Sequence, residues 1–150
     1  ARSELDVCSE FAYGHYTHEK NPVTTRAALT TIHIIEDEQL VDNACHIGAT
    51  MEVRLQDMME HHPLIGDVRG RGCLWGIDLV QDRATREPAC DIAEHVLYLA
   101  LTKGLSLKVS MGNVLTLAPP LVTTPEQITY ALGIIDECIF LASERRHPNA

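Results

Sequence analysis

Lysines could supply an amine nucleophile in this sequence, and paired histidines could supply metal ligands. The lysines, each a possible amine nucleophile, are Lys20, Lys103 and Lys108. Two pairs of histidines could suggest a metal site: His15 with His18, and His61 with His62. No ordered set of four ligands with the spacing of a zinc site accompanies them, so we predict no metal site.

The densest unusual pattern is a run of closely spaced glycines: Gly70, Gly72 and Gly76. It faintly resembles a dinucleotide-binding loop, but the spacing differs from that motif and no helix pattern follows. A close-packed, bulged strand explains the glycines better. We expect Arg69 and Arg71 in this strand to bond to loop carbonyls or to another domain rather than to substrate. Trp75 is predicted to lie in the core or at a domain interface.

Composition narrows the choice of partners. The 150 residues carry a net charge of −9, and their basic residues are scattered, which argues against a nucleic-acid partner. No apolar run approaches the roughly 20 residues needed to span a bilayer, so no membrane partner is expected. The five cysteines form no CxxC pair and are typical of single buried thiols in a reducing cytoplasm. They are Cys8, Cys45, Cys73, Cys90 and Cys138.

Helical periodicity predicts four helices separated by clear stop signals. The first begins at the Asn21 cap with Pro22 in its first turn, and it ends near residues 36–38. The second runs from Leu40 until Pro63 closes it. The third covers residues 89–103 and is followed by Gly104. The last begins at a capping box formed by residues 124–127.

Strand patterns fall between these helices. Residues 64–80 predict two short strands or one bulged strand. Residues 105–109 and 114–118 predict a hairpin around a turn at 111–113. The fold class is therefore α/β (α+β), with a largely antiparallel sheet of three or four strands covered by helices.

Three stretches of the sequence resemble the class III aminotransferases, the group of ornithine and 4-aminobutyrate aminotransferases. They are GHYTHEKNPV at 14–23, HPLIGDVRGRG at 62–72 and LAPPLV at 117–122. Their order and spacing follow the family's pattern along almost the whole chain. The chain is thereby identified as similar to the C-terminal portion of such an enzyme.

The resemblance implies a homodimeric enzyme of fold type I that uses pyridoxal 5'-phosphate. In the family a lysine forms the Schiff base with the cofactor, shortly before the segment that begins here at Ala1. None of the lysines present lies in that setting, so we expect this portion to be inactive alone. The implied division is an interface and phosphate-contacting segment at 1–21, connecting helices at 22–62, a small C-terminal domain at 63–145 and a tail at 146–150.

The resemblance also assigns one cofactor contact. Thr17 matches the family threonine that reaches across the dimer interface to the phosphate of the partner subunit's cofactor. A hydroxyl donor beside a helix start suits an anion. Alternatively, Thr17 caps its own loop.

A departure from the family pattern falls at Thr116. Many members have an arginine there, which binds the substrate carboxylate through two hydrogen bonds. Threonine cannot do this, so the carboxylate must be held differently, or the amino donor lacks one. The departure favours an ω-amine, an amino alcohol or racemase-like chemistry, and Thr116 is the predicted substrate-binding residue.

The expected function of the parent is transfer of an amino group from an amine or amino acid to a keto acid. Two alternatives remain open. The parent could be a pyridoxal-phosphate-dependent racemase or decarboxylase, or this chain could be a non-catalytic interaction or dimerisation module derived from the family.

Overall fold

The computed structural model describes residues 21–144, which fall into two compact units divided after Gln39. The described part of the first unit is helix α1 (Pro22–Asp37). The Asn21 side chain accepts a hydrogen bond of 2.9 Å from the Val23 amide, and Pro22 occupies the first turn, so the predicted cap is confirmed. No residue of α1 is buried.

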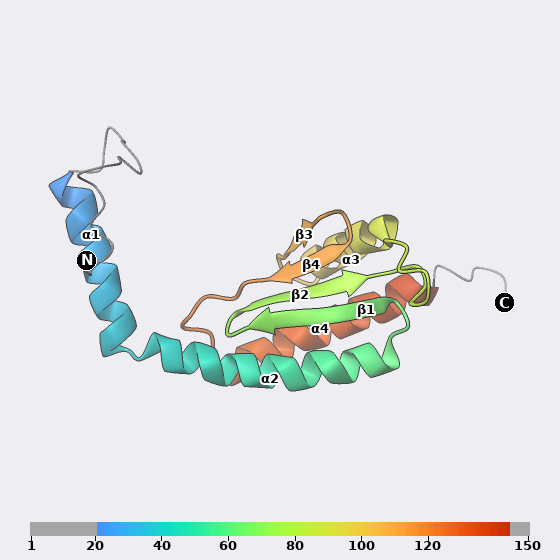
Figure 1. The fold of residues 1–150 in the computed structure, drawn as a ribbon, viewed down its shortest axis with the longest axis horizontal. Helices are drawn as coiled ribbons and strands as arrows, with labels where there is room; N and C mark the ends of the chain where they lie inside the picture. The colour runs from blue at the N-terminus through green and yellow to red at the C-terminus, as the bar shows by residue number, and fades with distance from the viewer. Residues whose placement is uncertain (1–20, 145–150) are drawn as a thin grey trace, which may run out of the picture. The chain divides into compact units, whose positions relative to one another are not determined.

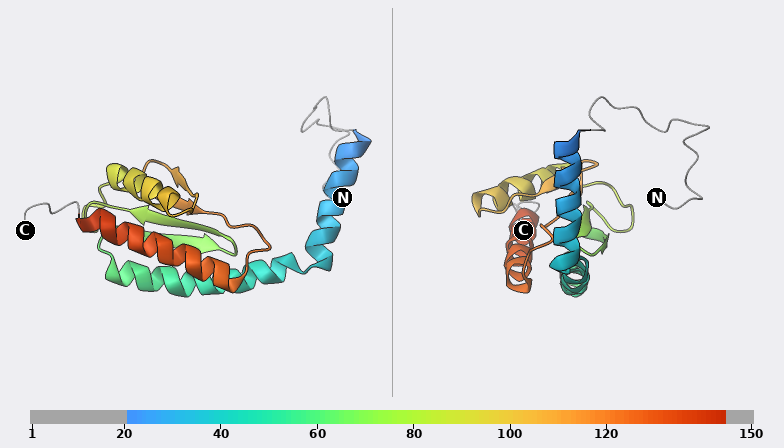
Figure 2. Two further views of the ribbon diagram at one scale, coloured as in Figure 1. Left: turned by 180° about the vertical axis from the view of Figure 1, so that it is seen from behind. Right: turned by 90° about the vertical axis from the view of Figure 1, so that its left-hand side faces the viewer.

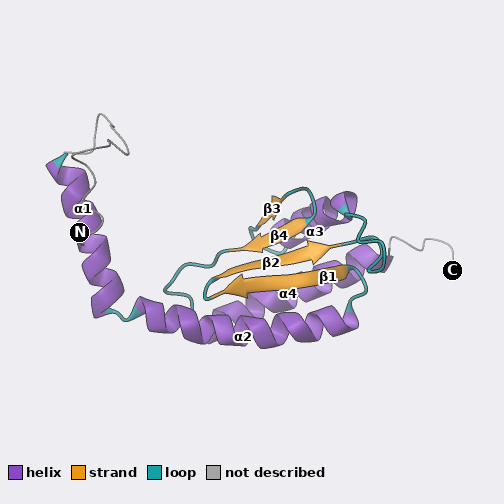
Figure 3. Ribbon diagram, viewed as in Figure 1, coloured by secondary structure: helices purple, strands orange, loops and turns teal. Residues whose placement is uncertain are grey.

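The second unit contains three helices and four strands (Figure 1, Figure 3). They are α2 (Leu40–His61), β1 (Ile65–Arg71), β2 (Leu74–Leu79), α3 (Cys90–Thr102), β3 (Lys108–Ser110), β4 (Val114–Leu117) and α4 (Pro125–Glu144). The strands form one sheet in the order β1-β2-β4-β3, and every neighbouring pair is antiparallel. The predicted α+β class is confirmed, and the glycine-rich stretch forms two strands.

All three helices of this unit lie on one face of the sheet (Figure 1, Figure 2). Helix α2 packs on β1 and α4, and α3 packs on α4 and the β3 side of the sheet. Because side chains alternate along a strand, every second residue enters the core. The core-facing residues of the two central strands, β2 and β4, are Trp75, Ile77, Leu79, Leu115 and Leu117. No described element of the unit covers the opposite face.

Glycine is required at two close approaches. A Cβ at Gly70 would lie 2.4 Å from the Trp75 ring, which fills the space beneath that strand. A Cβ at Gly48 of α2 would lie 2.8 Å from the Cα of Gly72 in the β1–β2 turn. The indole of Trp75 donates a hydrogen bond of 2.8 Å to the Gly72 carbonyl. Trp75 is only 6% exposed, so the predicted core position is confirmed.

The hairpin of β3 and β4 is shorter than predicted. Gly104 has φ +83°, as expected for the residue that ends α3, and the Leu105 amide then bonds to the Ala100 carbonyl at 2.9 Å. That amide is unavailable for a strand ladder, and pairing with β4 begins only at Lys108. At α4 the predicted capping box is present, because Thr124 and Gln127 exchange backbone-to-side-chain hydrogen bonds.

The predicted division into segments 1–21, 22–62, 63–145 and 146–150 stays a prediction. Helix α2, which that division groups with α1, packs on the sheet of the second unit. Within the described residues, no helix is long and apolar enough to cross a bilayer.

Candidate functional site

The uncovered face of the sheet carries the polar and charged side chains of its strands. The strand register places Arg69 opposite Gly76, Gly76 opposite Thr116, and Thr116 opposite Lys108. Directly opposite residues have Cβ atoms about 5 Å apart, so these positions form a continuous row across all four strands. Arg69 and Lys108 are exposed, whereas Gly76 and Thr116 are half-buried. Thr116, the predicted substrate-binding residue, thus lies near the middle of the row.

Thr116 is one of the residues that line each of two hollows. One, of about 420 Å³, lies on the β1–β2 side and is lined by Arg69, Gly70, Arg71, Leu74, Trp75, Gly76 and Thr116. The other, of about 470 Å³, lies between the β3–β4 hairpin and α4, and it is largely apolar apart from Ser106, Lys108 and Thr116. The Thr116 hydroxyl lies 2.9 Å from the Ser110 hydroxyl of β3. This hydrogen bond holds two hydroxyl groups together on the uncovered face.

Arg69 is held by carboxylates. Its guanidinium lies 2.6 Å from Asp67 and 3.4 Å from Asp78. The hydrogen bonds to Asp67 and Asp78 raise the pKa of Arg69, so its charge is both permanent and locally balanced. Of the two partners expected for Arg69, the loop carbonyls are wrong, because the described partners are carboxylates, and contact with another domain stays a prediction. The reason is the strand register, which pairs Asp67 with Asp78 and brings both carboxylates to the arginine.

The second carboxylate of this cluster also holds the hairpin turn. Asn113 is buried, and its side-chain amide donates to Asp78 at 2.6 Å and to the Leu79 carbonyl at 2.8 Å. Met111 and Gly112, which precede it, have φ of +57° and +88°. Asn113 therefore fixes the turn from which β4 runs toward Thr116.

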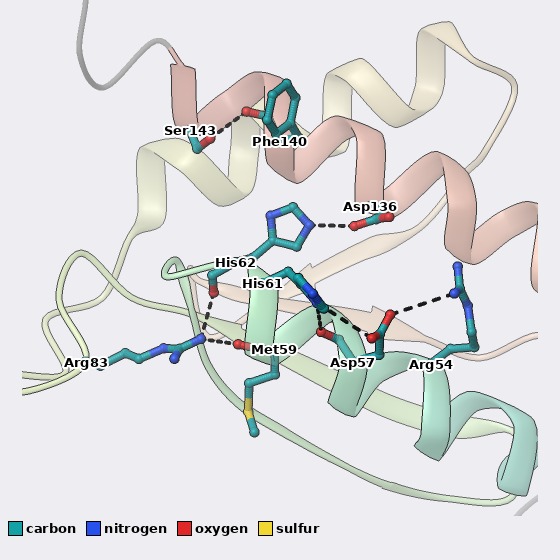
Figure 4. Close-up of polar contacts among 9 residues, drawn as sticks. All are labelled: Arg54, Asp57, Met59, His61, His62, Arg83, Asp136, Phe140 and Ser143. Atoms are coloured by element: carbon teal, nitrogen blue, oxygen red, sulfur yellow. Dashed lines mark hydrogen bonds and ion pairs between the residues drawn. The ribbon is translucent and has the colours of Figure 1, made fainter. Parts of the chain in front are cut away.

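A second polar cluster joins the end of α2 to α4 (Figure 4). The Nε2 atom of His62 lies 2.5 Å from the Asp136 carboxylate. Arg83 donates to the carbonyls of Met59, in the last turn of α2, and of His62 and Ile65 beyond it. These side chains are engaged in holding the fold. No group of three or more His, Cys, Asp or Glu residues within 21–144 is arranged to hold a metal ion.

Comparison with known proteins agrees with the fold. Residues 5–139 match the family Aminotransferase class-III. The chain is a member of the class III aminotransferase family.

Two curated relatives of this family member share about two-fifths of its residues. The (R)-1-hydroxy-2-aminoethylphosphonate ammonia-lyase of Vibrio splendidus (strain 12B01) is 42% identical over 138 residues, which are 92% of this chain and 29% of the relative. The isoleucine 2-epimerase of Lentilactobacillus buchneri is 41% identical over 122 residues, 81% of this chain and 27% of the relative. The chain thus spans less than a third of the length of either relative.

Solved transaminases have the same fold as this class III chain. The omega transaminase from Pseudomonas jessenii in complex with PMP matches with a TM-score of 0.83 at 26% identity, over 92% of this chain and 31% of that chain. Fold type I is therefore confirmed. The expectation that the parent protein depends on pyridoxal 5'-phosphate is confirmed at the level of the family.

The described lysines of this class III chain do not suit the covalent anchor of that cofactor. A Schiff-base lysine needs an amine of lowered pKa. The ammonium of Lys103 instead donates to Glu137 at 2.8 Å, and this hydrogen bond raises the pKa of Lys103. Lys108 is exposed on the edge strand β3. Lys20 and the predicted phosphate contact Thr17 lie outside the described residues.

The sequence did not indicate the partner of Thr116. Ser110 was placed in no site, although its hydroxyl bonds to Thr116. The expectation that Arg71 is structural stays a prediction. The alternation of residues 108–110 and 114–117 across a tight turn could have found the pair of Thr116 and Ser110. Nothing in the sequence indicates that Arg83 reaches the end of α2.

Proposed function

We propose that this chain is the C-terminal, substrate-facing part of an enzyme that uses pyridoxal phosphate to move an amino group from an amine or amino acid to a keto acid. The bound cofactor supplies an electron sink for the bonds at the amine carbon. The part described here contributes no covalent anchor and offers polar groups on the uncovered sheet face. We further propose that the parent is a homodimer in which Thr17 contacts the phosphate bound by the partner subunit.

The observation that carries the proposal is the position and identity of Thr116. It lies in the middle of the uncovered face, on the wall of the hollow beside β1 and β2, bonded to Ser110. A threonine hydroxyl offers one donor, whereas an arginine would offer a rigid, two-pronged cation. The proposed amino donor is therefore an amine or amino alcohol with no α-carboxylate bound at this position.

A second candidate reaction is loss of ammonia or inversion at the amine carbon without an amino acceptor. Its support is that the relatives with about 40% sequence identity to this chain include an ammonia-lyase and an epimerase. By name, the ammonia-lyase acts on an amine that bears a phosphonate. The two candidates share the bound amine and differ in where the nitrogen goes.

The deciding experiment uses the full-length protein that contains this chain, loaded with pyridoxal phosphate. A set of ω-amines, amino alcohols and α-amino acids is incubated with and without a keto acid. Product formation that requires the keto acid supports amino transfer. Ammonia release without it supports the lyase, and inversion without ammonia supports the epimerase. No reaction with any amine contradicts the proposal as a whole and favours a non-catalytic module.

The role of Thr116 has its own test in the same protein. Thr116→Arg restores the cation that many family members have, so we expect the KM for an α-amino acid donor to fall about tenfold or more. Thr116→Ser is the matched control, because it keeps the hydroxyl and adds no charge. An equal effect of both variants on α-amino acids and on simple amines would contradict substrate contact at this position.

The missing anchor is tested on the 150-residue chain itself. After mixing with pyridoxal phosphate and reduction with borohydride, mass spectrometry is expected to show no stoichiometric adduct on any lysine. A stoichiometric adduct on Lys103 or Lys108 would contradict the assignment of the anchor to another part of the parent.

A further inference from the structure

The positive charges on the uncovered sheet face are not all balanced. Arg69 is paired with Asp67 and Asp78. Arg71 and Lys108 form no ion pair with any residue in the described range 21–144. The nearby carboxylate of Asp78 is further occupied by the Asn113 amide. In a chain of net charge −9, this face therefore presents two cations that are free to bind an external anion.

The two free cations lie on opposite sides of Thr116. Lys108 is its direct partner across β3 and β4, and both line the hollow beside α4. Arg71 lies two residues along β1 from Arg69, on the same face, and lines the other hollow together with Thr116. Both side chains are long and flexible, so both can extend toward the part of the face that lies between them.

Space and donors for an anion are present between these cations. Gly76 sits between Arg69 and Thr116 in the row, and a Cβ there would lie only 3.2 Å from a methyl group of Val114. Gly76 thus adds no side chain to the floor of the hollow, where the Val114 methyl group already lies close to the strand. Next to it, the paired hydroxyls of Thr116 and Ser110 have one hydroxyl proton left to donate after their mutual hydrogen bond.

We propose that Arg71, Lys108 and the Thr116–Ser110 hydroxyl pair bind the tetrahedral phosphorus oxyanion of the substrate, a phosphonate or a phosphate monoester. This inference rests on the proposed function, because it assigns the anion to the amine that the enzyme acts on. A phosphorus oxyanion has three acceptor oxygens and nearly two charges. It matches two separate cations and a hydroxyl donor, whereas a planar carboxylate is best matched by one two-pronged guanidinium.

The test measures binding rather than turnover, so that it does not depend on the reaction. Methylphosphonate, methyl phosphate and acetate are titrated by calorimetry into the full-length protein. We expect both phosphorus anions to bind and acetate to bind at least tenfold more weakly. Methylphosphonate binding tighter than methyl phosphate identifies a phosphonate substrate, and the reverse order identifies a phosphate ester. Arg71→Gln and Lys108→Gln should each weaken phosphorus-anion binding about tenfold.

Arg86→Gln is the matched control, because it removes one positive charge from the exposed loop after β2 and should leave binding unchanged. Each variant must keep the unfolding temperature of the parent. Acetate binding as tight as methylphosphonate, or an equal loss in all three variants, would overturn the phosphorus-anion site. If no amine is turned over but methylphosphonate binding still depends on Arg71 and Lys108, the proposed reaction fails while the anion site stands.

If the enzyme turns over an amine, steady-state kinetics test whether this site contacts the substrate. With 2-aminoethylphosphonate, Arg71→Gln should raise KM about tenfold with little change in kcat. With propylamine, which has a similar length and no anion, KM should not change. An equal rise of KM for both amines would contradict a contact between Arg71 and the phosphorus group.

Discussion

His62 and Asp136, 74 residues apart in the chain, lie 2.5 Å apart and join the end of α2 to α4. His62 is only 8% exposed, whereas the Asp136 side chain keeps about two-fifths of its surface in water. We expect His62→Ala and Asp136→Ala each to lower the free energy of unfolding by about 1–3 kcal/mol. In a double-mutant cycle measured by urea unfolding, the coupling should be about 1 kcal/mol. A coupling near zero would mean that the contact adds nothing beyond packing.

Arg83 should contribute more to the free energy of unfolding than an ordinary surface arginine does. It donates to three carbonyls at or beyond the end of α2, those of Met59, His62 and Ile65. We expect Arg83→Ala to cost about 2–3 kcal/mol in urea unfolding, because hydrogen bonds from a charged donor are worth more than neutral ones. Arg86→Ala, in the same loop, should cost under about 0.5 kcal/mol. Equal costs would show that the carbonyl contacts of Arg83 are not stabilising.

Substitution by alanine should change the free energy of unfolding in opposite directions at two glycines, Gly70 and Gly133. Gly70→Ala places a methyl group 2.4 Å from both the Trp75 ring and the Leu74 carbonyl, so we expect a loss of about 1–3 kcal/mol. Gly133→Ala adds a methyl group to α4 with nothing within 4 Å, and it should raise the free energy of unfolding by up to about 1 kcal/mol. Thermal unfolding distinguishes the two, and a neutral Gly70→Ala would contradict the tight packing of Trp75.

The sequence predicted those features that depend on neighbouring residues. The Asn21 cap, the Thr124–Gln127 capping box and Gly104 at the end of α3 are local, and all were found where they were expected. The pairing of His62 with Asp136 depends on how separate elements pack, which no local pattern contains. The row through Thr116 likewise requires β2 and β4 to be neighbours, although a helix and β3 lie between them in the chain.

His61 provides a test of pH dependence. Its pKa is raised above the ordinary 6.5, first by the hydrogen bond from Nδ1 to the Asp57 carbonyl and then by the Asp57 charge. A raised pKa means that the protonated form stabilises the fold. This contribution is complete below pH 6.5 and is lost as pH rises through the raised pKa.

The two causes can be separated by NMR titration of the His61 ring. Asp57→Asn removes the charge but keeps the backbone carbonyl, so the pKa of His61 should fall only partly and remain above 6.5. If this variant brings the pKa fully to the ordinary value, the backbone hydrogen bond contributes nothing.

The contact between Gly48 and Gly72 has a consequence for molecular recognition. With backbone lying against backbone, the β1–β2 turn is seated on α2 without an intervening side chain that could change rotamer. The Cα atom of Arg71, at the edge of this turn, is therefore held in place. Only the side-chain torsions of Arg71 can change. In the proposed anion site, Arg71 would meet ligands of slightly different length by changing only its side-chain torsions, while the main chain keeps its position.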